Sequence, residues 1–253
     1  MTEADLKSLP ELFSAATDWS KADGMGDWSA VTALHELGTR DVLDRTLELS
    51  KSADLRARAR AATILGRLGL PDRTFPEECV DATLELLIRD PEPDVRAAAS
   101  DALWELEHPR GTKGLAALID HPDEVLRFHV ARALSGNPAP EAIAALIHLT
   151  KDPDPDVRDW ATFGLGEQGI IDTHEVREAL FQRMSDGDDD TQFEAVCGLA
   201  RCGDHRCVPS LIKRLTESPD EFWLLVAARR ILGLNEDSEQ SSDELLARLH
   251  SLD

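Results

Sequence analysis

The chain contains no long apolar run. None of its segments approaches the ~18 consecutive apolar residues that a transmembrane helix needs, and its first residues, MTEADLKSLP, lack the basic and apolar regions of a secretory signal. The four cysteines, Cys79, Cys197, Cys202 and Cys207, are too few for a disulfide framework and fit a reducing compartment. We therefore expect a cytoplasmic protein that is not embedded in a membrane.

Motifs of catalysis are also missing. The chain has no glycine-rich phosphate-binding loop, no Gly-x-Ser-x-Gly turn and no recognisable pairing of a nucleophile with a base. No strand pattern occurs either, so the sequence predicts an all-α fold. We expect neither an enzyme nor a resident cofactor.

Basic residues are outnumbered. The chain has 27 Lys and Arg against 49 Asp and Glu, a net charge of −22, and only six of the basic residues are lysines. Such a field repels phosphate backbones and anionic membranes, which argues against nucleic acid and membrane partners. It also accelerates association with a basic protein. Solubility, or adaptation to a salty cytoplasm, explains the charge at least as well, and the sequence leaves these interpretations open.

What the chain does have is a leucine that recurs seven times, each with a small residue four positions earlier. The leucines are Leu34, Leu65, Leu103, Leu134, Leu165, Leu199 and Leu232. Their partners are Ala30, Ala61, Ala99, Val130, Ala161, Ala195 and Ala228. A period of 31 to 38 residues over almost the whole chain indicates a solenoid of helical pairs.

Each period predicts two helices joined by a turn rich in Asp and Pro. In residues 94–106, Val95, Ala99 and Leu103 fall on one face of a helix. We call this second helix of each pair the B helix and the first one the A helix. The expected caps of three B helices are Asp94, Asp156 and Asp190. The A helices are expected at 41–50, 77–89, 113–119, 141–150, 175–184 and 208–215.

The repeated unit DPDPDVRDWATFGLGEQG, with its variant DPEPDVRAAASDALWEL, resembles the HEAT-repeat family, and within it the phycobilisome-lyase-like branch, over roughly residues 26–234. The resemblance implies an all-α, right-handed α–α superhelix, a HEAT-repeat solenoid of about six to seven helical pairs with capping helices. We expect residues 1–253 to form one such solenoid. Its parts are an N-terminal cap at 1–25, repeats at 26–234, and a polar linker with a C-terminal helix at 235–253.

The resemblance also assigns a role to arginines of the B helices, because Asp and Arg side chains form a ladder between adjacent HEAT repeats. The arginines at this position in four consecutive repeats are Arg58, Arg96, Arg127 and Arg158. Their expected partners are the carboxylates of Asp94, Asp156 and Asp190. We expect these pairs to brace the stack rather than bind an anion. Gln192 and Leu225 depart from the pattern in the last two repeats.

Two clusters suggest a metal site, and neither has the required spacing. Cys197, Cys202, His205 and Cys207 lie within eleven residues, but they lack the Cys-x2-Cys or His-x3-His spacing of zinc sites. The pairs at 35–36 and 174–175 match only part of the His-Glu pattern of HEAT-type deoxyhypusine hydroxylases, whose two irons need more ligands. We expect no bound metal.

The side of the B helices that the core does not use carries the candidate partner-binding residues. Counted from the repeat leucine, positions six before, two before and one after point away from the core. The aromatic residues there are Trp28, Phe128, Phe193, Phe163 and Trp104, and the neighbouring carboxylates are Asp101, Glu105, Asp159 and Glu167. An apolar stripe with an acidic rim suits protein binding. Alternatively, these rings are buried between adjacent repeats. Trp160 is expected in the core.

These patterns predict a non-enzymatic scaffold that binds a partner protein in the concave groove of the solenoid. From DVRDWATFGLGEQG through EAVCGLARCGDHRCVPSLIKRL the chain looks like HEAT proteins encoded beside Rhs-type toxins. That likeness implies an immunity protein for a basic toxin, such as a nuclease. Two alternatives stay open: a bilin-lyase-like protein acting on phycobiliproteins, and a scaffold that links the subunits of an assembly. The sequence does not indicate the oligomeric state.

Overall fold

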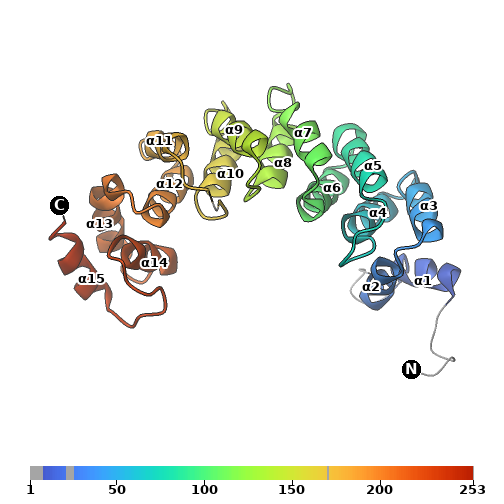
Figure 1. Ribbon diagram of the computed structural model, residues 1–253, viewed down its shortest axis with the longest axis horizontal. Coiled ribbons are helices and arrows are strands. Elements are labelled where there is room, and N and C mark those ends of the chain that lie inside the picture. Colours follow the sequence, from blue (N-terminus) through green and yellow to red (C-terminus); the bar gives the residue numbers. More distant parts are fainter. Residues whose placement is uncertain (1–7, 21–25, 170, 253) are drawn as a thin grey trace. The chain divides into compact units, whose positions relative to one another are not determined.

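The computed structural model describes residues 8–20, 26–169 and 171–252, and these residues form helices and no strands. The chain divides into two compact units, Met1–Leu118 (unit 1) and Ile119–Asp253 (unit 2), which are described separately (Figure 1). The described helices of unit 1 are α1 Leu9–Ala16, α2 Trp28–Leu37, α3 Arg40–Leu49, α4 Leu55–Arg67, α5 Pro76–Arg89, α6 Pro93–Leu106 and α7 Pro109–Ala116. Those of unit 2 are α8 Glu124–Leu134, α9 Pro140–Leu149, α10 Pro155–Leu165, α11 His174–Arg183, α12 Asp189–Arg201, α13 Val208–Glu217, α14 Phe222–Ile231 and α15 Ser242–Leu249, with a short 3-10 helix at His205–Cys207. The predicted all-α fold is confirmed, whereas a single continuous solenoid stays a prediction.

Within each unit the helices lie in two layers. In unit 1 the B helices α2, α4 and α6 stack side by side, and α3, α5 and α7 form the A layer (Figure 1). In unit 2 the B layer consists of α8, α10, α12 and α14, and the A layer of α9, α11 and α13. The last helix, α15, packs against α13 and α14. Consecutive A and B helices such as α5 and α6 in unit 1, and α9 and α10 in unit 2, pack on each other, as in other helical-repeat proteins.

The repeat leucines and their small partners form the core between the layers. All seven small residues and six of the seven leucines are buried. Leu232 is half-buried because it lies at the C-cap of α14. Small residues also let B helices approach closely, since a Cβ on Gly198 of α12 would lie 2.7 Å from the Cα of Gly166, directly after α10. The periodicity in the sequence therefore identified the core correctly.

The B helices begin slightly earlier than predicted. The caps of α6, α10 and α12 are Glu92, Asp154 and Asp188. The predicted caps Asp94, Asp156 and Asp190 instead lie in the first helical turn. Proline is favoured at the first helical position, where it loses no hydrogen bond. The helices α6 and α10 therefore begin at a proline, earlier in the chain than predicted. The carboxylates in the first turn still interact favourably with the helix dipole.

The segments outside the repeats are shorter helices and loops. The N-terminal cap predicted at 1–25 contains α1, Leu9–Ala16; residues 1–7 and 21–25 lie outside the described part. A loop joins α4 and α5, and its Arg73 donates hydrogen bonds to the carbonyls of Gly66, at 2.8 Å, and of Glu105. Among the described residues, no helix is long and apolar enough to cross a membrane.

The arginine ladder is present, but its carboxylates lie four residues earlier than predicted. The pairs are Arg58 with Asp90, Arg127 with Asp152 and Arg158 with Asp186, each made by two N–H···O bonds of 2.6–3.0 Å. Asp94, Asp156 and Asp190 are not the ladder partners, because they stand on the B helix itself, after the turn. The true partners stand at the start of the turn, where each also accepts the N–H of the residue two positions later.

The ladder carboxylates are ionised and pair with the arginines. Burial raises the pKa of Asp90, Asp152 and Asp186, but their hydrogen bonds with arginine and with the backbone outweigh burial and hold each pKa below its usual value. Arg96 occupies the same position on α6. Where the pattern ends, the amide of Gln192 donates to the carbonyl of Asp186 at 2.7 Å.

Candidate partner-binding faces

Four of the predicted partner-binding residues come together in unit 1. A groove of about 330 Å³ crosses the B layer at α2, α4 and α6. The residues that line it are Trp28, Thr63, Gly66, Arg67, Ala98, Asp101, Ala102, Trp104 and Glu105. Trp28 and Trp104 are 46% and 43% exposed and stand on α2 and α6, the two neighbours of α4. We call this hollow the tryptophan groove.

Small residues make room for the groove. Gly66 of α4 lies against α6, since a Cβ on this glycine would lie 2.9 Å from the Cα of Ala102. Ala98 lies one helical turn before Ala102, so alanines line this side of α6. The groove thus follows from close helix packing beside two large rings.

Trp28 is held by an arginine of the next B helix. The guanidinium of Arg60 lies 4.3 Å from the centroid of the Trp28 ring and 5.5 Å from that of Trp19. Arg60 is only 7% exposed, and burial lowers its pKa. This cation–π contact orients Trp28 without covering it.

An ion pair within unit 1 lines the tryptophan groove. Arg67 of α4 forms an ion pair with Glu105 of α6, and the hydrogen bond between them raises the pKa of Arg67. The loop residue Arg73 binds the carbonyl of Glu105. The exposed indole surface is therefore the main feature that this groove offers to a partner.

In unit 2 the predicted rings form a ladder of their own. Phe128 of α8 contacts Trp160 of α10 edge-to-face, with ring centroids 5.8 Å apart, and Trp160 contacts Phe163 at 5.5 Å. All three rings are half-buried. Packing between repeats accounts for part of their surface, and Trp160 links the other two rings instead of lying in the core. We call these three residues the ring ladder.

Phe193 does not join the ring ladder. It is half-buried and lines a separate hollow of about 330 Å³ together with Lys213 and Arg214 of α13. Phe193 therefore belongs to a different surface from the other predicted rings. The sequence analysis grouped Phe193 with the other rings because it lies six positions before its repeat leucine. A side chain at this position points toward the next B helix, and the residues that it meets there differ from repeat to repeat.

The two predicted carboxylates of unit 2 differ in their environment. Glu167 forms an ion pair with Arg230 of α14 at 2.9 Å, and Arg230 also binds Glu236 at 2.7 Å. Asp159 is half-buried, and its Oδ1 has no hydrogen-bond partner among the described residues. Burial, together with Asp190, Asp188 and Asp156, raises the pKa of Asp159 to about 6.

Glu194 of α12 is a residue that the sequence reasoning missed. It is half-buried, its Oε2 lacks a hydrogen-bond partner among the described residues, and burial with Asp159, Glu167 and Asp190 raises its pKa to about 8. It lies five positions before the repeat leucine, a position left out of the predicted face. Phe222 and Trp223, which are exposed at the start of α14 and contact each other, were also missed.

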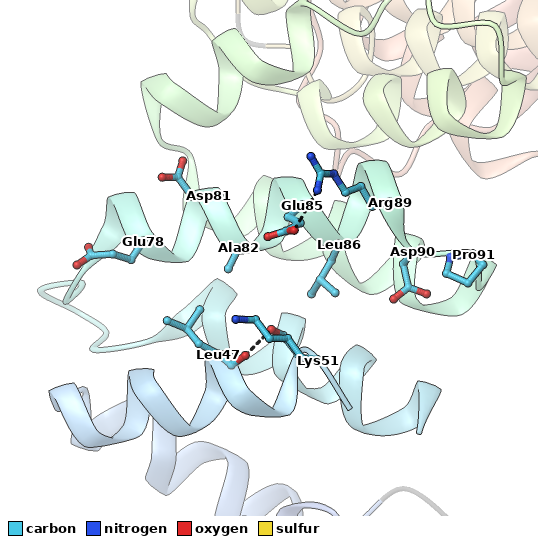
Figure 2. A pocket seen from close by; sticks show the side chains of 11 residues that line it. Leu47, Lys51, Glu78, Asp81, Ala82, Glu85, Leu86, Arg89, Asp90 and Pro91 are labelled. Atoms are coloured by element: carbon cyan, nitrogen blue, oxygen red, sulfur yellow. Dashed lines mark hydrogen bonds and ion pairs between the residues drawn. The ribbon is translucent and has the colours of Figure 1, made fainter. Parts of the chain in front are cut away.

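A hollow of about 410 Å³ in the A layer of unit 1 is a less suitable docking site. Figure 2 shows Glu78, Asp81, Glu85 and Arg89 along α5, with Leu47 of α3 on the facing side. Each of the three glutamate and aspartate side chains is paired: with Arg40 at 3.2 Å, Arg110 at 2.9 Å and Arg89 at 3.5 Å, respectively. No large ring lines this hollow.

The cysteines are packing residues. All four are free and buried. Burial raises the pKa of Cys79 and Cys207 to about 12, so neither thiol ionises near neutral pH. His35 is buried as well, with its Nε2 3.2 Å from the carbonyl of Thr63. Within the described ranges, no three His, Cys, Asp or Glu side chains are placed to hold a metal ion.

The repeats match a known family. Residues 80–166 and 143–234 match the family model for HEAT repeats, and together they cover more than half of the chain. The chain belongs to the HEAT-repeat family. Protein YibA of Escherichia coli strain K12 is 24% identical over 200 residues, which are 75% of this HEAT-repeat chain and 69% of YibA.

Solved structures share this HEAT-repeat fold. The X-ray structure of YibA aligns with a TM-score of 0.65 and 20% identity, over 97% of this chain and 92% of that one. An archaeal HEAT-like repeats protein from Thermococcus onnurineus NA1 aligns at 0.55 with 17% identity, over 97% and 99%. The complex of CpcE and CpcF of phycocyanin lyase from Nostoc sp. PCC7120 aligns at 0.50 with 19% identity, over 100% and 97%. At these identities the likeness concerns the fold alone.

Proposed function

We propose that this HEAT-repeat protein binds a partner protein through its B-layer faces and acts without catalysis. The tryptophan groove carries the proposal. Two tryptophans with nearly half of their surface exposed line one hollow, and tryptophan is among the residues that contribute most to binding energy at interfaces. Exposed apolar surface rimmed by charge is typical of protein interaction sites.

The net charge indicates the kind of partner. With 49 acidic and 27 basic residues, the chain attracts a basic protein and accelerates its encounter. We propose that this partner is a basic toxin domain, such as a nuclease, which the HEAT-repeat protein masks as an immunity protein. The resemblance to HEAT proteins encoded beside Rhs-type toxins supports this choice. The alternative partner is a phycobiliprotein, on which a bilin-lyase-like protein would act. The CpcE–CpcF complex of phycocyanin lyase shares the fold of this chain.

The binding test compares two exposed tryptophans. The products of the adjacent genes are co-expressed with the full chain, and the one that co-purifies at fixed stoichiometry is used for affinity measurements. Trp104→Ala is expected to weaken binding by about 2 kcal/mol, roughly thirtyfold. The matched control is Trp223→Ala, which removes a similarly exposed indole, 47% against 43%, from unit 2. Equal losses in both variants would remove the tryptophan groove from the proposal.

A growth test separates the possible partners. Expression of the neighbouring gene alone is expected to arrest growth, and the HEAT-repeat chain is expected to restore it, with Trp104→Ala restoring it less well. Rescue by a chain that does not bind the toxin argues against masking. A shift in the absorption spectrum of bilin on mixing with the chain and a phycobiliprotein favours the lyase-like alternative instead.

A further inference from the structure

The carboxylates that line the tryptophan groove all stand on one of its three helices, α6. They are Asp101 and Glu105, and Trp104 lies between them in the sequence. Residues three and four apart are neighbours on a helix surface, so these three side chains share one side of α6. Asp101 is exposed, whereas Glu105 is half-buried and pairs with Arg67 of α4. The negative side of the groove is therefore the side of α6.

Cations occupy the opposite side of the groove. The guanidinium of Arg60 on α4 lies 4.3 Å from the centroid of the Trp28 ring, and Arg60 is almost fully buried, so it covers the inner face of this ring. The exposed surface of Trp28 belongs to the remaining face and edges. Another cation over that face would have the like charge of Arg60 behind the ring, where little water screens the repulsion. Arg67 adds a positive charge on α4. The hollow beside Trp28 therefore disfavours a cation.

The floor of the groove is apolar. Gly66 and Ala102 are buried, and a Cβ on Gly66 would lie 2.9 Å from the Cα of Ala102. Ala98, one turn earlier on α6, is half-buried. The volume of about 330 Å³ is near the lower end of the range for ligand pockets, and a whole helix is too wide for it. The hollow thus fits one aliphatic side chain, whose burial against methyl groups and indoles removes apolar surface from water.

We propose that the tryptophan groove binds a segment of the partner protein in which one aliphatic side chain enters the hollow and a neighbouring basic side chain lies along α6 beside Asp101. Charge complementarity decides this arrangement, because the cations of the groove lie toward Trp28 and its carboxylates lie on α6. The inference rests on the proposed function for the identity of the partner as a protein. It adds the two chemical groups that the groove recognises and the place of each.

The spacing of the two groups follows from the helices. Packed neighbouring helices such as α4 and α6 have axes about 8–10 Å apart. In an extended segment, side chains two residues apart point to the same side and lie about 7 Å apart. An aliphatic residue over α4 therefore places a basic residue two positions away above α6. The expected signature in the partner is a leucine-sized residue and an arginine or lysine separated by one residue.

Short peptides provide the test. The full chain, labelled for NMR, is titrated with an acetylated, amidated peptide that carries Leu-Gly-Arg between Gly-Ser flanks. Three twin peptides replace its leucine by alanine, its leucine by arginine, or its arginine by citrulline, which is neutral and has nearly the same shape. The alanine twin is expected to bind about tenfold more weakly, because it buries less apolar surface. The arginine twin is expected to bind no better than the alanine twin, despite its additional positive charge.

Each peptide result has a contrary outcome. Binding of the arginine twin at the affinity of the leucine peptide or above it overturns the assignment of the hollow to an aliphatic side chain. The citrulline twin is expected to bind about threefold more weakly at low salt, and high salt is expected to remove this difference. Equal binding of the citrulline twin at low salt overturns the role of the basic residue. If the leucine peptide does not bind at millimolar concentration, the whole inference is wrong.

Matched variants locate the two groups. Ala98→Leu fills the hollow and is expected to weaken the leucine peptide about tenfold. Its control is Ala97→Leu, at a half-buried position of α6 that does not line the groove. Asp101→Asn, at an exposed position that leaves the packing intact, is expected to remove the preference for the leucine peptide over its citrulline twin. Its control is Asp44→Asn on α3, in the A layer of unit 1. Thermal unfolding verifies that the variants are folded, and equal effects in a variant and its control overturn the placement.

The outcome is distinguishable from that of the proposed function, because the peptide titration needs no partner protein. If Trp104→Ala weakens partner binding while the arginine twin binds as tightly as the leucine peptide, the proposed function stands and this inference is wrong. If the peptides behave as expected but Trp104→Ala leaves partner binding unchanged, the groove selects these groups and the proposed function fails.

Discussion

The B-layer face of unit 1 carries two exposed tryptophans and the Arg67–Glu105 ion pair. That of unit 2 carries half-buried rings and two half-buried carboxylates, each with one oxygen that accepts no hydrogen bond from a described residue. In unit 1, Arg67 of α4 forms an ion pair with Glu105 of the neighbouring helix α6. In unit 2, burial and Asp159 raise the pKa of Glu194, and no described residue donates a hydrogen bond to its buried Oε2. The same two repeat positions, six before and five before the leucine, hold Ala59 on α4 and Ala98 on α6. At these two positions the same framework thus carries alanines in unit 1 and carboxylates in unit 2.

A repeat protein tolerates change at some positions of its repeat and not at others. Positions that contact the next layer keep leucine or alanine in both units, because a change there leaves a cavity or a clash. Positions at the seam between two B helices contact solvent on one side, so alanine and carboxylate are both compatible with folding. The pKa of a carboxylate at such a position depends on the side chains around it rather than on its place in the repeat.

The largest expected effect tests the framework that the two units share. Arg58→Ala in unit 1 and Arg127→Ala in unit 2 are each expected to lower the free energy of unfolding by about 3 kcal/mol, because each leaves a buried aspartate without its cation. Urea unfolding of both variants measures the effect. The low pKa of Asp90 and Asp152 gives the sign of the pH dependence: the stabilisation is present above the pKa of the unfolded chain and is lost as the pH falls through the folded value. A loss confined to one unit would show that the frameworks differ.

The second expected effect is an increase in the free energy of unfolding, and it distinguishes the B-layer face of unit 2 from that of unit 1. Glu194→Gln is expected to raise the free energy of unfolding by about 2 kcal/mol at pH 8 and to have little effect at pH 4. The raised pKa of Glu194 means that its own contribution to the stability of unit 2 is greatest below the unfolded pKa and is lost as the pH rises toward about 8. Thermal unfolding at both pH values measures it. A variant that is less stable at pH 8 would show that Glu194 is paired.

A third effect concerns the cations over the rings. Arg60→Lys in unit 1 is expected to cost about 1 kcal/mol, since the guanidinium is buried at 4.3 Å from the Trp28 centroid. Arg132→Lys in unit 2, where the corresponding distance to Trp160 is 5.7 Å, is expected to cost less. Tryptophan fluorescence during urea unfolding reports both variants. Equal costs would remove this difference between the faces.

The smallest effect is at the ion pair of the tryptophan groove. Glu105→Gln is expected to destabilise unit 1 by about 0.5 kcal/mol, because Arg67 is half exposed and solvent screens the pair. The destabilisation is expected to disappear in high salt. Thermal unfolding at low and high salt measures it. A stabilising effect, as expected for Glu194→Gln, would make the two faces electrostatically alike.

Much of the fold was readable from the sequence. The leucines and alanines of the period are the core because periodicity of this kind reflects a helix face that is buried in every repeat. The candidate face was only partly readable. Trp28, Asp101, Trp104 and Glu105 were correctly grouped, since positions near the repeat leucine point to one side. Phe193 was not, because its surroundings depend on α13 and α14.

The ladder was also only partly predictable from the sequence. The arginine positions follow from the repeat, but the sequence suggested the wrong aspartates. The turns at 90–94, 152–156 and 186–190 each begin and end with an aspartate, and only the path of the chain through the turn decides which one meets the arginine. Glu194 was missed because a half-buried acid on a helix looks like a solvated one until the neighbouring helix is in place.

The amino-acid sequence by itself determined the period, the all-α class, the buried leucine and alanine positions and the acidic character, because each depends on residue type and spacing along one helix. Only the tertiary structure decided which aspartates complete the ladder, that two tryptophans share a groove, and that burial raises the pKa of Asp159 and Glu194. Burial, pairing and pKa depend on side chains from other helices, and those meet only when the repeats have stacked.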